Sequence, residues 1–393
     1  MKLGIDIRPL QGETRYRGIG KSLEFFLDSF AVNLPADIEP VFYIDKTLQA
    51  PEALSMFPQA SCIKVDGSPL GRMRYVRSVL PSYPLLKVRK RDVDVVLQYD
   101  AALGIPKNVP TITIFHDLIP YLFRDQERRL PAQGMRKVKN SLARNLYWQK
   151  YLRVLKSYPR SKHVVAISTA SKKDLLNYAT VIQPSQVSVV PHGVRPFIVS
   201  GKPTKKVISL TAEQYLLYVG GIDFRKNVTG LLKTFFELKS TYPKLKLITV
   251  GKEFGLDDQL EDLGWNEQLR LHPREARDVV SPGFLSETDL HYLYANAAAF
   301  VFPSRYEGFG MPLLEAMQAG CPVIAYKNSS IPEVAGDAAL LIEDGEDLKE
   351  AVGSLLDSNS MRQQYIKKGL SQVKKFTWDN TVSQILEICR KNV

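Results

Sequence analysis

Residues 302–320 read FPSRYEGFGMPLLEAMQAG, directly after an apolar run over residues 297–302 that predicts a buried strand. Gly308 and Gly310 predict a tight turn with positive φ and room for a ligand close to the backbone. Pro312 suits the first turn of a helix, where its missing N–H costs nothing. The helix has an apolar stripe and ends near Gly320. The stretch therefore predicts a strand, a glycine turn and a helix.

Two carboxylates bracket this turn. Glu307 precedes it, and Glu315 lies inside the predicted helix. The N–H groups at a helix N-terminus bind phosphate, and carboxylates accept hydrogen bonds from hydroxyls. We therefore expect a site for a ligand that is both phosphorylated and rich in hydroxyl groups.

The length and composition indicate a two-domain globular protein. The chain has 393 residues, of which 45% are hydrophobic and 24% charged. Cys62, Cys321 and Cys389 are far apart, so neither a metal site nor a disulfide framework is expected. Their presence as free thiols favours a cytoplasmic location. The first residues lead straight into a strand, and no apolar run approaches the ~20 residues of a membrane span, so neither a signal peptide nor a membrane span is predicted.

The formal net charge of +12 is concentrated in two stretches. Residues 128–162 contain eleven Lys or Arg and no Asp or Glu, interleaved with leucine and aromatic residues, and residues 72–91 contain seven more Lys or Arg. Such a pattern suits an anionic membrane surface, a lipid-phosphate acceptor or nucleic acid. A solvated helix face explains the pattern equally well.

Short apolar runs alternate with helical patterns along the whole chain, as in a parallel α/β sheet. A polar stretch, residues 200–213, is the predicted linker. Strands are predicted in the first half at residues 3–7, 41–44, 62–65, 93–97, 111–115, 164–167 and 187–190, and in the second half at 215–219, 245–250, 279–285, 298–302, 323–326 and 339–342. Helices are predicted at residues 21–30, 229–238, 287–296, 311–319 and 378–388. Two doubly wound domains of this kind bind ligands at the carboxyl ends of their strands.

The loop before the first predicted helix holds Gly18-Ile19-Gly20-Lys21-Ser22. It lacks the first glycine of a P-loop, and no dinucleotide-binding glycine pattern follows the first strand. The amides of this loop at the helix N-terminus are able to contact a phosphate, although an ordinary βα loop explains the sequence pattern as well.

Other polar residues follow predicted strands. His116 follows the strand at residues 111–115, which favours a functional role over a structural one. Asp92 and Asp94 form a D-x-D pattern, but they lead into a strand, so no obligatory metal is predicted.

Two further loops lie at the carboxyl ends of strands in the second predicted sheet. Gly220-Gly221 is followed by Arg225-Lys226 at a helix N-terminus, which provides fixed cations for a diphosphate leaving group. Residues 281–285 end another strand, where backbone groups and an apolar face are able to hold a nucleobase, although a plain turn remains an alternative.

Together these stretches resemble the family 4 retaining glycosyltransferases, which have the GT-B fold. The resemblance covers essentially the whole chain, and its motifs stand in the family's order. His192 stands where many members have asparagine. The motifs are Arg17-Gly18-Ile19-Gly20, Phe115-His116-Asp117, Ala166-Ile167-Ser168 with Ser171-Lys172, Pro191-His192-Gly193-Val194, Gly220-Gly221 with Arg225-Lys226-Asn227, and the E-x7-E pair Glu307 and Glu315.

The resemblance implies two Rossmann-like domains facing each other across a cleft. Residues 1–198 would form the acceptor-side domain, joined by a C-terminal helix over residues 376–393, and residues 199–375 would bind the nucleotide sugar. The implied catalytic residues are His116, Arg225, Lys226 and Glu307. The implied donor contacts are Gly18, Gly20, Gly221, Arg225, Lys226, Gly283, Phe284, Leu285, Glu307, Gly308, Phe309, Gly310, Met311, Leu314 and Glu315.

Within that set the resemblance also implies individual roles. Arg225 and Lys226 would clasp the diphosphate in place of a metal, Glu307 would bind the donor sugar, and Glu315 would bind the ribose. The amides near Gly18 and Gly20 would cap the phosphates, and His116 would lie beside the sugar and the acceptor.

The resemblance implies transfer of a sugar from a nucleoside diphosphate sugar to a hydroxyl of a glycan or lipid-linked acceptor, with retention of the anomeric configuration. UDP-sugars such as UDP-glucose are the favoured donors, with GDP- and dTDP-sugars open. No cofactor, metal or nucleic-acid partner is expected. The enzyme is expected in the cytoplasm, at the inner face of the membrane if residues 128–162 bind lipid. A nucleotide-sugar epimerase of the same fold and a non-catalytic nucleotide- or nucleic-acid-binding protein are the alternatives.

Overall fold

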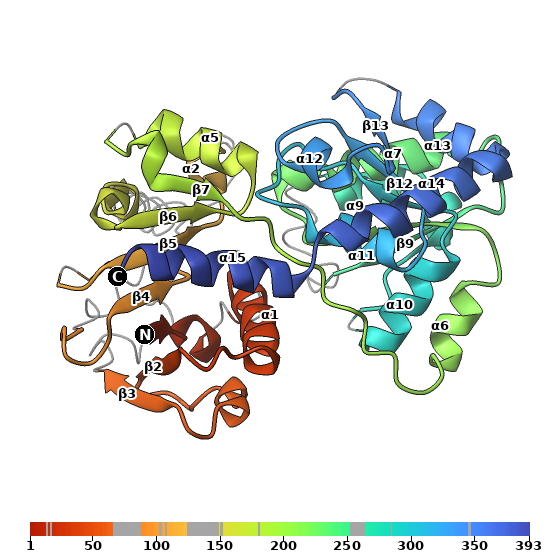
Figure 1. Ribbon diagram of the computed structural model, residues 1–393. Helices are drawn as coiled ribbons and strands as arrows, with labels where there is room; N and C mark the ends of the chain where they lie inside the picture. Colours follow the sequence, from red (N-terminus) through yellow and green to blue (C-terminus); the bar gives the residue numbers. More distant parts are fainter. Residues whose placement is uncertain are drawn as a thin grey trace, which may run out of the picture. The chain divides into compact units, whose positions relative to one another are not determined.

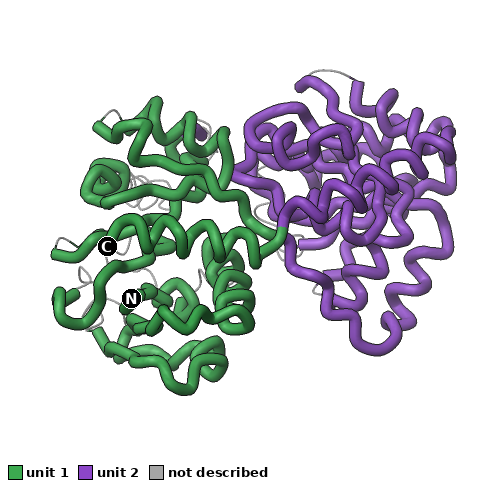
Figure 2. Tube along the Cα trace, in the orientation of Figure 1, with its two compact units in different colours: residues 1–121, 132–193, 377–393 green, residues 122–131, 194–376 purple. Residues whose placement is uncertain are grey.

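The structure is a computed structural model that describes residues 1–393 except 13, 14, 16, 17, 66–87, 102, 103, 107, 124–148, 150, 151, 180, 252–263, 284, 345 and 346. The chain divides into two compact units (Figure 2). Unit 1 contains Met1–Tyr121, Ala132–Gly193 and Thr377–Val393, and unit 2 contains Leu122–Pro131 and Val194–Phe376. The main boundary lies between Gly193 and Val194, and the predicted boundary lies between residues 198 and 199.

Unit 1 is built on a parallel sheet in the order β3-β2-β1-β4-β5-β6-β7 (Figure 1). All five residues of β5 are buried, as expected for a strand that is covered on both faces. The strands are β1 (Lys2–Asp6), β2 (Glu39–Asp45), β3 (Ser61–Val65), β4 (Val95–Gln98), β5 (Thr111–Phe115), β6 (His163–Ala166) and β7 (Val187–Val189). The helical elements are η1 (Arg8–Gln11), α1 (Gly18–Val32), η3 (Glu52–Met56), α2 (Ile119–Leu122), η6 (Tyr158–Arg160), α5 (Thr169–Tyr178), η7 (Pro184–Gln186) and α15 (Trp378–Lys391).

The last helix, α15, packs against α1 inside unit 1 (Figure 1). The rings of Phe25 and Trp378 meet edge to face at 5.9 Å, and Ser29 donates to Asp379 at 2.6 Å. The helix buries Val382, Ile385, Leu386 and Cys389 on one face. Burial of such an apolar stripe stabilises the unit by roughly 1.5–3 kcal/mol for each large side chain. The C-terminal segment is therefore part of the core of unit 1.

Gly193 ends the middle segment of unit 1 at a point where a side chain does not fit. A Cβ on this residue would lie 2.2 Å from the backbone nitrogen of Trp378 and 2.5 Å from the carbonyl carbon of Thr377. The chain thus leaves unit 1 in direct contact with the segment by which it returns.

Unit 2 is built on a second parallel sheet, in the order β10-β9-β8-β11-β12-β13 (Figure 1). Its strands are β8 (Tyr215–Val219), β9 (Lys246–Val250), β10 (Val279–Val280), β11 (Ala299–Phe302), β12 (Val323–Tyr326) and β13 (Ala339–Ile342). Its helical elements are α6 (Lys205–Leu210), η8 (Phe224–Lys226), α7 (Val228–Leu238), α9 (Trp265–Leu271), η10 (Glu275–Asp278), α10 (Glu287–Asn296), α11 (Met311–Gln318), α12 (Ile331–Ala335), α13 (Leu348–Asp357), α14 (Asn359–Gln372) and η11 (Val373–Lys375).

The strand order of unit 2 has a switch point between β8 and β11. These two strands pair directly although β9 and β10 lie between them in the sequence. The chain runs from β8 to one edge of the sheet and then returns beside β8 to continue to the other edge. Doubly wound sheets bind ligands where the loops that follow two such strands diverge.

Two sequence predictions for unit 2 were wrong in part. The predicted linker contains α6, because the Thr204 side chain accepts from the Val207 N–H and caps a helix there. The strand expected over residues 279–285 ends at Val280, because Pro282 has no N–H to continue the ladder and Gly283 has φ of +83°.

The two doubly wound sheets confirm the α/β fold class that the sequence predicted. Across the part of the chain that the structure describes, no helix is long and apolar enough to cross a bilayer.

Candidate functional site

The loop that follows β8 carries the two cations that the sequence singled out. It forms the short helix η8, and the Asp223 side chain caps this helix by accepting from the Arg225 N–H at 3.2 Å. Asn227, with φ of +50°, ends η8 and begins α7. The Arg225 carbonyl accepts from the Arg305 N–H at 2.7 Å, so the loop after β8 is bonded to the loop after β11. The switch point thus brings the two loops together.

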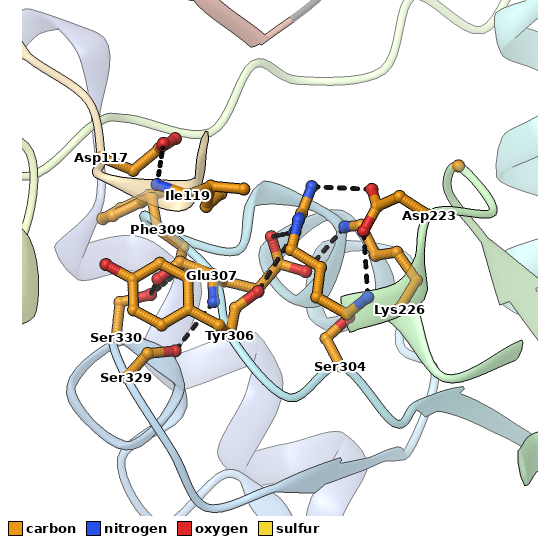
Figure 3. A network of polar contacts seen from close by, with 12 residues as sticks. Asp117, Ile119, Asp223, Lys226, Ser304, Tyr306, Glu307, Phe309, Ser329 and Ser330 are labelled. Atoms are coloured by element: carbon orange, nitrogen blue, oxygen red, sulfur yellow. Dashed lines mark hydrogen bonds and ion pairs between the residues drawn. The ribbon is translucent and has the colours of Figure 1, made fainter. Parts of the chain in front are cut away.

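Both cations contact Glu307. Lys226 Nζ lies 2.6 Å from Glu307 Oε1, and Arg225 Nη1 lies 3.1 Å from Glu307 Oε2. Arg225 Nη2 is also 3.1 Å from Asp223 Oδ2. Figure 3 shows Asp223 and Lys226 beside Glu307. Two cations and two carboxylates therefore form a charge-balanced cluster, which we call the ion cluster.

The ion cluster is largely removed from water. Glu307 and Lys226 are each 8% exposed, while the side chain of Asp223 is 50% exposed. Burial opposes the ionisation of Glu307, but the charges of Lys226 and Arg225 outweigh burial, and the pKa of Glu307 lies below its ordinary value. Glu307 is consequently a fixed anion near neutral pH. Because a buried charge without a partner is costly, the cluster members stabilise one another.

Two serines after β12 hold the backbone of the glycine turn (Figure 3). The Ser330 hydroxyl is fully buried and lies within hydrogen-bond distance of the carbonyls of Glu307 (3.0 Å) and Phe309 (2.8 Å). The Ser329 hydroxyl accepts from the Glu307 N–H at 2.8 Å, and Ser329 adopts φ of +46° to do so. Neither serine was predicted as a site residue, although both lie within four residues of the predicted strand at residues 323–326. They fix the backbone on both sides of Glu307.

The turn enters α11 at Gly310. This residue has φ of +105°, a region that favours glycine, and Pro312 follows in the first helical turn as predicted. Gly308 was also expected to have positive φ, and that prediction was wrong, because Gly310 alone makes the reversal in this turn. The N–H groups at the start of α11, including that of Met311, belong to the first helical turn.

The second glutamate of the pair lies on α11. Tyr294, from α10, donates to Glu315 Oε2 at 3.2 Å. Burial raises the pKa of Glu315 above its ordinary value, and the bond from Tyr294 acts in the opposite direction. Leu314, one of the implied donor contacts, is fully buried in the core, and Phe309 is 5% exposed.

The remaining predicted donor contacts of unit 2 lie in its loops. The Gly221 carbonyl accepts from the Tyr218 hydroxyl at 2.5 Å. Gly283 has φ of +83° in an exposed turn, and Leu285 is half-buried. Phe284 lies outside the described residues.

In unit 1 the predicted histidine follows β5. The His116 Nε2 lies 3.1 Å from the Tyr99 carbonyl, and the Ser171 hydroxyl donates to the His116 carbonyl at 2.8 Å. Burial lowers the pKa of His116 to about 4, and the bond to Tyr99 opposes this shift. The imidazole is therefore neutral at neutral pH.

A second histidine lies beside it. His192 is 3% exposed, its Nε2 lies 3.0 Å from the Ser22 hydroxyl of α1, and its ring stacks on Trp378 of α15 at 5.1 Å. The rings of His116 and His192 are 5.7 Å apart. Burial lowers the pKa of His192 well below its ordinary value, and His116 adds to this shift. We call the two residues the histidine pair.

The glycine loop of unit 1 forms the start of α1. The helix begins at Gly18, earlier than the predicted start at Lys21, so Gly18 and Gly20 supply N–H groups of its first turn. Gly18 is exposed and Gly20 is buried. Arg8, which follows β1, is fully buried in a bidentate ion pair with Asp6 at 2.6 Å.

The described residues show no cluster of three or more His, Cys, Asp or Glu side chains that would hold a metal ion. Asp94, from the D-x-D pattern, accepts from the backbone N–H of Lys2 at 2.6 Å. Most of the basic stretches over residues 72–91 and 128–162 lies outside the described residues.

Family models of known proteins match both halves of the chain. A family model described as Glycosyltransferase Family 4 matches residues 37–196, and one described as Glycosyl transferases group 1 matches residues 202–372. The O-antigen chain mannosyltransferase B of Escherichia coli is 28% identical over 340 residues, covering 81% of this chain and 82% of that protein. The Escherichia coli serotype-specific mannosyltransferase WbdA is 28% identical over 71% of this chain, which matches 33% of that longer protein.

Solved structures agree on the fold. Anabaena HepE, solved in complex with UDP and glucose, superposes over 100% of both chains with a TM-score of 0.66 at 14% sequence identity. From the two family models, the mannosyltransferase relatives and the paired Rossmann-like sheets, we conclude that the chain belongs to the glycosyltransferases of the GT-B fold.

Proposed function

We propose that this glycosyltransferase transfers mannose from a nucleoside diphosphate mannose to a hydroxyl of a growing glycan, with retention of configuration and without a metal ion. The observation that carries this proposal is the ion cluster, in which Arg225 and Lys226 lie at the switch point of unit 2. The choice of mannose follows the names of the relatives and departs from the UDP-glucose that the sequence favoured. UDP remains a candidate nucleotide, since HepE was solved with it.

The two cations supply what a departing diphosphate needs. As the bond between the anomeric carbon and the phosphate oxygen breaks, negative charge builds on the diphosphate. A Lys point charge and an Arg fork, held in place before the reaction, stabilise that charge without further reorganisation. Because both cations are paired with carboxylates in the free protein, the donor diphosphate takes over part of these contacts.

Glu307 has a binding role in this scheme. Its carboxylate is held by Lys226 and Arg225 and its backbone by Ser329 and Ser330, so it is a fixed acceptor for hydroxyls of the donor sugar. Glu307 is a weak base, because its pKa is lowered and its carboxylate is paired with two cations. In the proposed step the acceptor oxygen therefore bonds to the anomeric carbon on the face that the diphosphate leaves, and the acceptor proton passes to the leaving phosphate oxygen.

The test is a donor panel. The purified protein is given GDP-mannose, UDP-mannose, UDP-glucose and dTDP-glucose with a mannose-containing oligosaccharide, and nucleotide release is measured with EDTA or with Mg²⁺. We expect turnover of a mannose donor at equal rates in both buffers. Loss of turnover in EDTA would contradict the metal-free scheme, and turnover restricted to glucose donors would contradict mannose.

Product analysis tests the stereochemistry. NMR of the anomeric proton is expected to show the same configuration in product and donor. It also separates transfer from the epimerase alternative, because epimerisation consumes no acceptor. An inverted product would exclude the same-face route.

A further inference from the structure

A basic pocket of about 670 Å³ lies in unit 1, at the end of the sheet where the parallel strands begin. Its lining includes Lys90, Asn108, Arg160, Lys162 and Ser185, and further lining residues directly precede β5, β6 and β7. These strands are parallel neighbours, so the residues that precede them lie together at the amino ends of the strands (Figure 1). His116 follows β5 at the opposite end, and the pocket is thus separate from the histidine pair.

The described residues offer no counter-charge to this pocket. Lys90, Arg160 and Lys162 are exposed, and none of them forms an ion pair with a residue that the structure describes. Among the residues that the structure describes, the lining contains no Asp or Glu. The carboxylates nearest to Lys90 in the sequence have other partners: Asp92 lies 3.8 Å from Arg91, and Asp94 accepts from the Lys2 N–H. Three cations therefore share one depression.

The fold, rather than the sequence, brings these cations together. Lys90 comes from the basic stretch over residues 72–91, and Arg160 and Lys162 come from the stretch over residues 128–162. A fourth cation, Lys172 of α5, donates to the Val187 carbonyl at 2.5 Å. It is close enough to the lining residue His163 to add to the effect of burial in lowering the pKa of that imidazole. Two stretches that are remote in sequence thus form one surface.

We propose that this basic pocket binds the phosphate group of a phosphate ester, as a site separate from the donor site. Lys90 and Lys162 offer point charges, Arg160 offers a planar fork that matches two phosphate oxygens, and Asn108 and Ser185 add neutral donors. The volume exceeds that of a single phosphate ion, so the ester group occupies the pocket as well. The ester is either a lipid headgroup or a soluble phosphorylated compound.

The experiment compares two triple variants of the full chain. Lys90→Gln, Arg160→Gln and Lys162→Gln together remove the pocket cations. The control variant, Lys64→Gln, Lys173→Gln and Lys205→Gln, removes the same charge from exposed lysines outside the pocket. One arm measures the shift in melting temperature with glycerol phosphate against sodium chloride of equal ionic strength. The other arm measures binding to phosphatidylcholine vesicles with and without phosphatidylglycerol.

We expect the control to behave as the wild type in both arms and the pocket variant to lose at least one response. If the ester is a lipid headgroup, vesicle affinity falls about a hundredfold, because each Lys or Arg near an anionic surface contributes roughly a factor of five. If the ester is soluble, only the thermal shift is lost. Phosphate that enters the donor site shifts all variants equally and therefore cancels in the comparison.

Equal responses of the two triple variants in both arms would overturn the proposal. The replaced side chains are exposed, so we expect melting temperatures without ligand to be alike. If the pocket variant melts lower than the control, the single variants Arg160→Gln and Lys162→Gln replace it. Wild-type binding in both of these would likewise overturn the proposal.

Discussion

The ion cluster of unit 2 and the histidine pair of unit 1 handle charge in opposite ways. In the ion cluster, four ionised side chains are held together with balanced charge, and all of them except Asp223 have little contact with water. In the histidine pair, burial keeps two imidazoles neutral. The first arrangement suits a ligand whose charge changes during a reaction, and the second suits a ligand that needs neutral hydrogen-bond partners. The comparison predicts that substitutions act on activity in one region and on the pH dependence of stability in the other.

The largest effect is expected from removal of the central ion pair. The double variant Lys226→Met and Glu307→Gln takes away one cation and one anion, so no buried charge is left without a partner. We expect kcat/KM for the donor to fall by roughly a hundredfold to a thousandfold, as for the loss of a transition-state contact. The melting temperature should stay close to that of the wild type.

The control for this variant is Lys233→Ala, which removes an exposed lysine of α7. Donor kinetics and melting curves are measured on all three proteins. Near-wild-type turnover in the double variant would remove the basis for placing the diphosphate at Arg225 and Lys226.

A smaller effect on activity is expected from Ser330→Ala. This change removes the buried hydroxyl that the carbonyls of Glu307 and Phe309 share as a donor, which costs about 1–3 kcal/mol of stability. Because the backbone of Glu307 loses its position, we expect kcat/KM for the donor to fall roughly tenfold. Ser330→Thr, which keeps the hydroxyl, should recover most of the loss.

The matched control is Ser240→Ala, where an exposed hydroxyl bonded to the Glu237 carbonyl is removed. Steady-state kinetics with the donor varied, together with thermal melts, separate the two roles. A Ser330→Ala protein that melts lower but keeps its donor kinetics would show that the serine supports the fold alone.

A modest gain is expected from Asp223→Asn. Asparagine keeps a side-chain oxygen for the cap of η8, while Arg225 loses one of its two carboxylate partners and the ion cluster gains a net positive charge. Since Asp223 is half-exposed and screened by water, we expect only about a threefold to fivefold tighter binding of UDP and GDP. Calorimetry measures this, with Asp278→Asn, which removes the carboxylate partner of Lys239, as the control. Weaker nucleotide binding in Asp223→Asn would show that Asp223 holds Arg225 in its binding position.

The smallest effect concerns the pH dependence of stability. The histidines of the unfolded chain bind protons below pH ~6.5, whereas His116 in the folded protein remains neutral down to about pH 4. The two neutral histidines therefore contribute fully to the free energy of unfolding above pH ~6.5. This contribution is lost as the pH falls, by at most about 1.4 kcal/mol per pH unit for each histidine.

His192→Asn should flatten this dependence by removing one of the two groups. Urea unfolding between pH 7 and pH 5 measures the slope, and His291→Asn, in unit 2, is the control. An unchanged slope in His192→Asn would mean that His192 is protonated in the folded protein.

Most elements could be predicted from the sequence, because parallel strands that are buried on both faces are continuous apolar runs. The strand at residues 111–115 and the helix at residues 287–296 agree residue by residue with β5 and α10. Short elements that depend on one cap or one break were harder. A single side chain, Thr204, starts α6 inside the predicted linker, and Gly283 with Pro282 ends β10 early.

The site was predictable where a motif stands next to a strand and less so where partners come from elsewhere. Arg225, Lys226 and Glu307 were predicted as donor residues, but their pairing depends on the adjacency of β8 and β11, which the sequence order does not give. Ser330 and Tyr294 were missed because a serine after a strand and a tyrosine on a helix have no distinguishing pattern. The roles of Arg225, Lys226 and Glu307 as catalytic or donor-binding residues stay predictions until the substitutions are made.

The discontinuity of unit 1 has a consequence for its synthesis on the ribosome. The segment Thr377–Val393 supplies α15, which packs on α1, and Gly193 is shaped to receive the backbone of Trp378. All residues of unit 2 are therefore synthesised before the helix that completes unit 1. The nascent N-terminal segment has to wait with the apolar face of α1 uncovered until α15 has been synthesised. A premature stop codon before residue 378 would leave this face open to chaperones and proteases, even though nearly all of unit 2 had been made.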